Sequence, residues 1–98
     1  MSPNPPWQIF GTEDCLDRWQ EQETPSADLS YLVAEWLVSK MDDPHQGMRR
    51  IPDFPNLWFG KITRSDQGSD SVVVCTYEIN EAERTVQLRS IATLSKPF

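Results

Sequence analysis

The second half of the sequence contains one group of side chains that could act on a substrate, the basic residues Lys61, Arg64 and Arg89. If the fold brings them together, cations of this type can stabilise the charge that develops on a phosphate group as it is cleaved or transferred. The simpler interpretation is that they form ion pairs across neighbouring strands, each worth about 0.2–1 kcal/mol. On the residues alone we favour ion pairing. The acids near enough for it are Asp66, Glu78 and Glu83.

Other reactive side chains are few. His45 is the only histidine and lies beside Asp42 and Asp43 in a proline-bounded loop, and one imidazole next to two adjacent carboxylates is a weak pattern for a metal site. We therefore expect a solvated loop, no metal and no cofactor. The two cysteines, Cys15 and Cys75, are too few for a disulfide scaffold, and we interpret them as reduced thiols. Cys75 falls in an apolar run, which predicts a buried, unreactive thiol.

The clearest secondary-structure signal is a helix that starts at Thr24-Pro25 and ends before Pro44. A threonine hydroxyl can cap a helix, and proline is favoured at the first helical position. The apolar stripe that should face a sheet recurs at helical spacing and consists of Leu29, Leu32, Val33, Trp36 and Leu37. Because Trp36 lies at the centre of this stripe, it is predicted to be buried against the sheet.

A shorter helix is predicted before this one, from a cap at Thr12 to about Gln22, and β-strands are expected at residues 7–10, 57–63, 71–79 and 85–94. The order β-α-α-β-β-β predicts an α+β fold, with two N-terminal helices packed on one face of an antiparallel sheet. The last three strands should form a meander because their connections are short. Residues 1–6 contain three prolines and predict a flexible arm, and residues 7–98 predict a single domain.

The strand sequences also predict which side chains point away from the helices, because alternate residues of a strand share a face. The apolar residues expected on this open face, as a partner-binding set, are Phe59, Val72, Val74 and Ile91. The same face is expected to carry the polar side chains of Lys61, Thr76 and Arg89. So apolar a surface indicates either a partner-binding site or a face covered by another part of the chain, and the sequence leaves both open. A β-bulge in a strand would reverse the assignments beyond it.

Charge is divided unevenly along the chain. Residues 1–48 contain nine acids and two bases, which sum to −7, whereas residues 49–98 contain six acids and seven bases, which sum to +1. The total of −6 argues against a strong nucleic-acid binder, which usually carries excess positive charge. We expect no secretory signal, because the first residues form neither a basic nor an apolar region, and no membrane span, because no stretch approaches about 20 apolar residues. We therefore expect a cytoplasmic protein that does not associate with a membrane.

Four segments, taken in order, resemble the RelE/ParE superfamily of toxins from bacterial toxin–antitoxin modules. They are the helix at residues 27–41, the loop Arg49-Arg50-Ile51-Pro52, the strand Leu57-Trp58-Phe59-Gly60-Lys61-Ile62 and the hairpin from Val72 to Val86. The resemblance covers residues 7–94 and lies in the order of the elements, which ends with a polar turn, a strand rich in Val and Tyr, an acidic turn and a Val-rich strand. It implies a RelE/ParE-like domain over residues 7–98.

The resemblance also implies a function. Members of the superfamily inhibit translation by cleaving mRNA on the ribosome, or inhibit DNA gyrase, and an antitoxin protein neutralises them. By position, Lys61, Arg64 and Arg89 match the catalytic bases of the sheet, and Arg49 and Arg50 match the basic loop before it. The catalytic set is incomplete, because residues 95–98 contain no His, Tyr or Arg of the kind that ribonuclease members use. The alternative is a non-catalytic protein-interaction module on the same scaffold.

Overall fold

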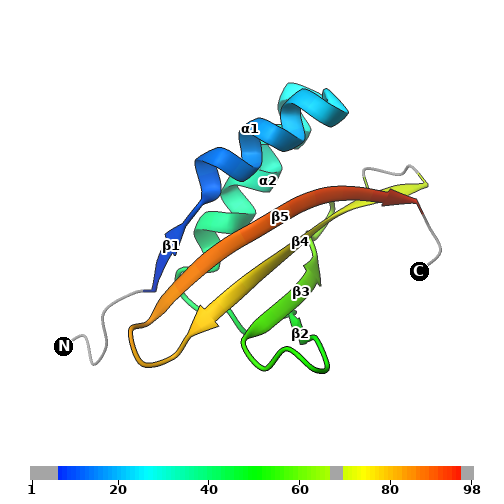
Figure 1. Cartoon of the computed structure of the whole chain (residues 1–98). Helices are drawn as coiled ribbons and strands as arrows, with labels where there is room; N and C mark the ends of the chain where they lie inside the picture. Colours follow the sequence, from blue (N-terminus) through cyan, green and yellow to red (C-terminus); the bar gives the residue numbers. More distant parts are fainter. Residues whose placement is uncertain (1–6, 67–69, 96–98) are drawn as a thin grey trace.

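The computed structural model describes residues 7–66 and 70–95, so the predicted arm at residues 1–6 lies outside the described part of the chain. A short strand is followed by two helices and then by four further strands (Figure 1). In chain order the elements are β1 (Gln8–Phe10), α1 (Thr12–Glu23), α2 (Ala27–Ser39), β2 (Arg49–Arg50), β3 (Leu57–Lys61), β4 (Ser71–Asn80) and β5 (Thr85–Ser95). Neither described helix is long and apolar enough to cross a membrane.

The strands form one five-stranded sheet in the order β1-β5-β4-β3-β2, and the predicted α+β class with two helices against a sheet is confirmed. The meander of β3, β4 and β5 is antiparallel, as expected. The sheet as a whole is mixed rather than antiparallel, because β1 pairs in parallel with β5. β2 is an additional edge strand beside β3. The sequence gives no signal for β2, because only Arg49 and Arg50 pair with β3 before Pro52.

Both helices begin at residues other than the predicted ones. The N-cap of α1 is Gly11, in the left-handed conformation with φ of 83°, and Thr12 is already helical. The N-cap of α2 is Ser26, whose hydroxyl accepts a hydrogen bond from the Leu29 N–H at 3.1 Å. Thr24 instead caps the C-terminus of α1. The predicted start of α2 is therefore two residues early, because Thr24 and Ser26 are both residues that can cap a helix.

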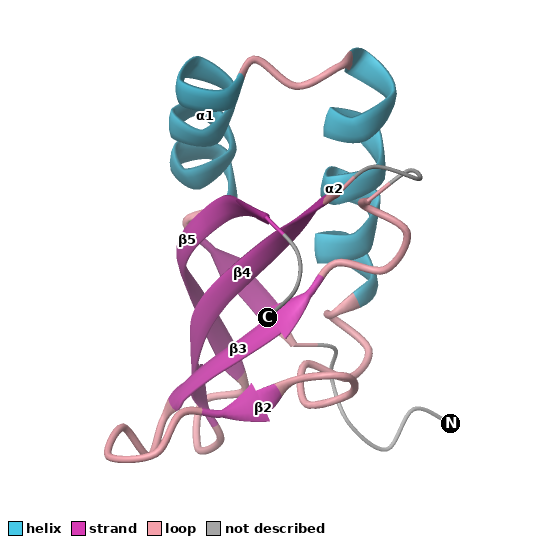
Figure 2. Ribbon diagram, turned by 90° about the vertical axis from the view of Figure 1, so that its right-hand side faces the viewer, coloured by secondary structure: helices cyan, strands magenta, loops and turns pink. Residues whose placement is uncertain are grey.

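The hydrophobic core lies between the helices and one face of the sheet (Figure 2). The helices contribute Trp19 of α1 and Val33 and Leu37 of α2, each at most 1% exposed. Burying side chains of this size stabilises a fold by about 1.5–3 kcal/mol each. The sheet contributes Val73, Cys75, Tyr77, Ile79, Val86 and Leu88.

Trp36 is only partly buried, so the prediction that it is the buried centre of α2 is wrong. It lies at the margin of the core, where the Lys40 ammonium sits 4.6 Å from the centre of its ring. Lys40 is itself buried and donates a hydrogen bond to the Gln46 carbonyl, and burial lowers its pKa. The most buried tryptophan is instead Trp19 of α1, at 1% exposed.

Candidate functional site

The face of the sheet opposite the helices can be assigned from strand register, because directly paired residues of antiparallel strands point to the same side. Phe59 pairs with Thr76, and Lys61 pairs with Val74. Neither of these β4 residues belongs to the helix-side core cluster, whereas Cys75 and Tyr77 do. Phe59, Lys61 and Val74 therefore share the open face.

A β-bulge changes the other assignments on β5. Thr76 pairs with Ser90 while its neighbour Tyr77 pairs with Leu88, so Arg89 is an extra residue in β5. An extra residue reverses the alternation of side chains beyond it. The prediction that Ile91 lies on the open face is therefore wrong, because Ile91 is 7% exposed and packs in the core. The β5 residues opposite Val74 and Val72 are Ala92 and Leu94.

The open face has fewer accessible apolar side chains on its strands than the sequence predicts. Val72 and Val74 are only 7% and 4% exposed. The large apolar side chains that are exposed near it are Leu94, at 38%, and Phe54, at 57%. Phe54 was not indicated by any periodicity, because it lies in the proline-containing loop before β3. A loop residue next to a sheet can be found only from the folded structure.

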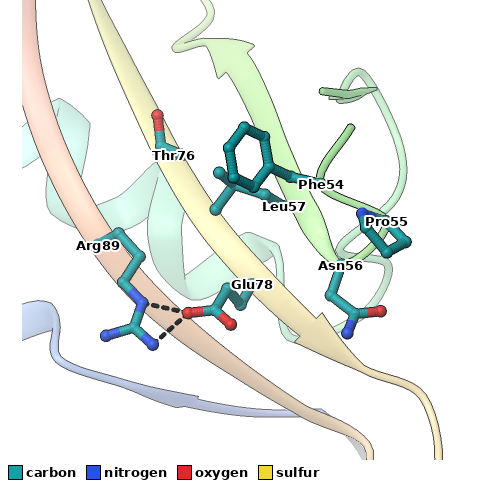
Figure 3. Close-up of a pocket in the computed structure, with 7 residues that line it drawn as sticks. All are labelled: Phe54, Pro55, Asn56, Leu57, Thr76, Glu78 and Arg89. Carbon is teal, nitrogen blue, oxygen red and sulfur yellow. Dashed lines mark hydrogen bonds and ion pairs between the residues drawn. The ribbon is translucent and has the colours of Figure 1, made fainter. Parts of the chain in front are cut away.

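One pocket of about 470 Å³ lies on this face (Figure 3). The residues that line it are Phe54, Pro55, Asn56, Leu57, Thr76, Glu78 and Arg89. We call it the Arg89 pocket. The side chains of Phe54 and Leu57 lie on one side, and the Arg89 guanidinium points along the sheet toward Glu78. The pocket therefore combines an apolar wall with one pair of opposite charges.

The Arg89 guanidinium is engaged by an acid of its own pocket. Its Nε and Nη2 atoms both contact Oε1 of Glu78, so the ion-pair interpretation is confirmed for this base. The two side chains are 54% and 40% exposed, and such a pair contributes about 0–1 kcal/mol to stability. Its larger consequence is electrostatic. The positive charge that could meet a phosphate or a carboxylate here is already balanced.

A second hollow of about 440 Å³ lies near the other end of β3. The residues that line it are Gly47, Arg49, Phe59, Gly60, Lys61 and Leu94, and we call it the Lys61 pocket. It brings together two of the predicted bases and one of the predicted apolar residues. Arg50 lies one residue out of phase with Arg49 and pairs with Trp58.

The three predicted catalytic bases, Lys61, Arg64 and Arg89, do not line one pocket. Arg89 lines the Arg89 pocket, Lys61 lines the Lys61 pocket, and Arg64 lines neither. Arg64 is exposed in the turn after β3, where it adopts a left-handed backbone conformation with φ of 65°. Stabilising a phosphate in a cleavage reaction needs donors that point at one position. The three bases instead lie in three separate places, and Arg89 is already paired with Glu78.

Cys75 is fully buried, as its sequence context predicts. Burial raises the pKa of its thiol to about 12, so the thiol stays protonated at neutral pH. Because the thiolate is the reactive form, Cys75 is a structural residue of the core.

His45 lies in a packed cluster rather than in a solvated loop. Its ring stands edge-on between Trp7 and Trp58, with centroids 5.7 Å and 5.1 Å away. Its Nε2 atom is 2.6 Å from a carboxylate oxygen of Glu81. These contacts join the loop after α2 to the residue before β1, to β3 and to the β4–β5 turn. Within residues 7–66 and 70–95, no three His, Cys, Asp or Glu side chains are grouped as a metal site would require.

Comparisons with known proteins bear on the fold. No protein-family model matches the sequence, and no curated protein sequence does. The structure matches that of the E. coli toxin RelE, solved in the free state as a double arginine-to-alanine mutant, with a TM-score of 0.61. The match covers 90% of this chain and 83% of the RelE chain, at 13% sequence identity. The chain has a RelE-like fold. This agrees, at the level of the fold, with the resemblance seen in the order of its elements.

Proposed function

We propose that this protein is the toxin, or a toxin-derived component, of a bacterial toxin–antitoxin module, and that it acts by binding its target rather than by cleaving RNA. The observation that carries the proposal is the charge arrangement of the open face within a RelE-like fold. Glu78 balances Arg89, and the remaining bases are divided between a second pocket and an exposed turn. Such a face can hold a partner but lacks a convergent set of cations.

The antitoxin is proposed to cover the open face. The Lys61 pocket offers an apolar floor from Phe59 and Leu94 between the basic side chains of Arg49 and Lys61. A segment of a partner that carries an apolar side chain followed by an acidic one would complement it in shape and charge. The target of the toxin, translation or DNA gyrase, is proposed to contact the same face, because an antitoxin neutralises most directly by occupying it.

Induction of the gene alone in bacteria tests the proposal. We expect growth arrest, an intact reporter mRNA and, if gyrase is the target, a fall in plasmid supercoiling. The double variant Arg49→Ala/Lys61→Ala should relieve the arrest and remain folded, because both side chains are exposed. Glu13→Ala, an exposed change on α1, is the matched control and should remain toxic.

Two outcomes would contradict the proposal in different ways. Cleavage of the reporter mRNA that is lost in Arg89→Ala would show that the site is catalytic. Induction without any effect on growth would remove the toxin assignment, and the non-catalytic interaction module would then account better for the charge arrangement of the open face. Circular dichroism of each purified variant separates loss of function from loss of fold.

A further inference from the structure

α2 has a second apolar stripe on the side that faces away from the sheet. Its residues are Ala27, Tyr31, Ala34 and Val38, at successive spacings of four, three and four residues. Tyr31 is 68% exposed and Val38 is 64% exposed, which makes them the two most exposed large apolar side chains of the described residues. The side chains of α2 that pack in or against the core are Leu29, Leu32, Val33, Trp36 and Leu37. At about 100° per residue this set is centred on the opposite side of the helix from the outer stripe.

The spacing of the outer stripe is that of the apolar positions of a helical heptad. A small residue, Ala34, lies between the larger Tyr31 and Val38. Large and small side chains that alternate along a helix leave hollows into which the side chains of a second helix can insert. An exposed Tyr and Val at this spacing therefore fit a helical partner better than an extended one.

The charged residues beside the outer stripe indicate which kind of helix could bind there. Asp28 and Glu35 are seven residues apart and so form an acidic row along one flank. Lys40, at the end of α2, is buried and directed at the Gln46 carbonyl, so it does not offset this row. If a second copy packed antiparallel across a two-fold axis, the acidic row of one chain would face the same row of the other. Like charges would then oppose self-association.

We propose that the outer stripe of α2 docks an amphipathic helix of another protein, with Lys or Arg beside its own apolar heptad positions. This surface lies on the helix side of the sheet, away from both pockets of the open face, so the inference does not depend on the proposed toxin function. It adds a second interaction surface to the molecule.

Three synthetic helical peptides of three heptads each test the proposal with the full-length chain. Two carry the same leucine stripe, flanked by Lys in one and by Glu in the other, and the third is a scrambled form of the Lys peptide. Fluorescence anisotropy should give the Lys-flanked peptide a Kd at least about tenfold lower than either of the others. The double variant Tyr31→Ser/Val38→Ser should weaken its binding by about tenfold or more.

Two further variants make the test specific. Asp28→Lys/Glu35→Lys should reverse the preference, so that the Glu-flanked peptide binds more tightly. Phe10→Ser, which also removes an exposed apolar side chain but on β1, should leave binding unchanged. Equal binding of the Lys peptide and its scrambled form, or no effect of Tyr31→Ser/Val38→Ser, would overturn the proposal. So would a dimer in sedimentation that these two substitutions dissociate, because a second copy would then be the occupant.

Discussion

Trp19 should be the side chain whose loss costs this fold most. It is 1% exposed, and its indole N–H donates a 3.0 Å hydrogen bond to the Thr93 hydroxyl of β5. Cys15 is the only other buried residue of α1, so the attachment of this helix to the sheet depends on few contacts. Trp19→Ala should lower the free energy of unfolding by about 3–5 kcal/mol. A domain of this size has about 5–15 kcal/mol in total, so the loss is a large fraction.

The packing and hydrogen-bond contributions can be separated. Thr93→Val keeps the shape of the side chain but leaves the buried indole N–H without an acceptor, which should cost about 1–3 kcal/mol. Trp19→Phe removes the donor and part of the ring. In the double variant Trp19→Phe/Thr93→Val the two losses should be less than additive, because the hydrogen bond can be lost only once.

Urea unfolding followed by circular dichroism measures these changes. Trp36→Ala is the internal control, because Trp36 is only partly buried and should therefore cost less than Trp19. A loss below about 1 kcal/mol for Trp19→Ala, or a larger loss for Trp36→Ala, would refute the packing of α1 described above.

Three further predictions concern the core, the β1–α1 turn and the Arg89 pocket. Burial raises the pKa of the Cys75 thiol from 9.0 to about 12, so between these pH values the thiol is protonated in the folded chain and ionised in the unfolded chain. The contribution of this thiol to stability is therefore complete below pH 9 and declines as the pH rises toward 12. Between these values the wild type should lose up to about 1.4 kcal/mol per pH unit more than Cys75→Ala, and parallel stability curves would contradict this. Gly11→Ala should destabilise by about 2 kcal/mol or more, since φ is 83° and a Cβ would lie 2.9 Å from the Leu88 carbonyl oxygen; an unchanged melting temperature would count against it. Glu78→Gln should change stability by less than about 1 kcal/mol but increase affinity for single-stranded RNA, and adding Arg89→Ala should cancel the increase.

Periodic patterns account for the parts of the fold that the sequence predicts. The apolar run through Val73, Cys75 and Tyr77 indicates a central strand, and β4 is paired on both sides. The helical spacing of α2 identifies the helix and its buried residues Val33 and Leu37. The same spacing cannot show that Trp36 is less buried than Val33 and Leu37. How deeply a stripe residue is buried depends on where the sheet lies beneath the helix, which is a tertiary property.

The open face shows why the candidate site is harder to predict than the fold. Because Arg89 is an extra residue in β5, Ile91 points into the core and not to the open face. No residue type in β5 predicts this bulge. Pockets pose the same difficulty. The Arg89 pocket joins Phe54, from an irregular loop, to β4 and β5 residues more than twenty positions away. The packed environment of His45 likewise depends on Trp7, Trp58 and Glu81, which lie far from it in the sequence.

The two proposed surfaces constrain any single partner that uses both. The Lys61 pocket lies on the open side of the sheet, and the outer stripe of α2 lies on the helix side. The shortest dimension of the molecule is 22 Å, and an extended chain spans about 3.3 Å per residue. A partner that reaches both surfaces therefore needs about seven or more residues between a basic amphipathic helix and an acidic, apolar segment. Shortening that connection should abolish simultaneous binding while each half still binds alone, because the second contact gains from the first only if the linker can span the distance.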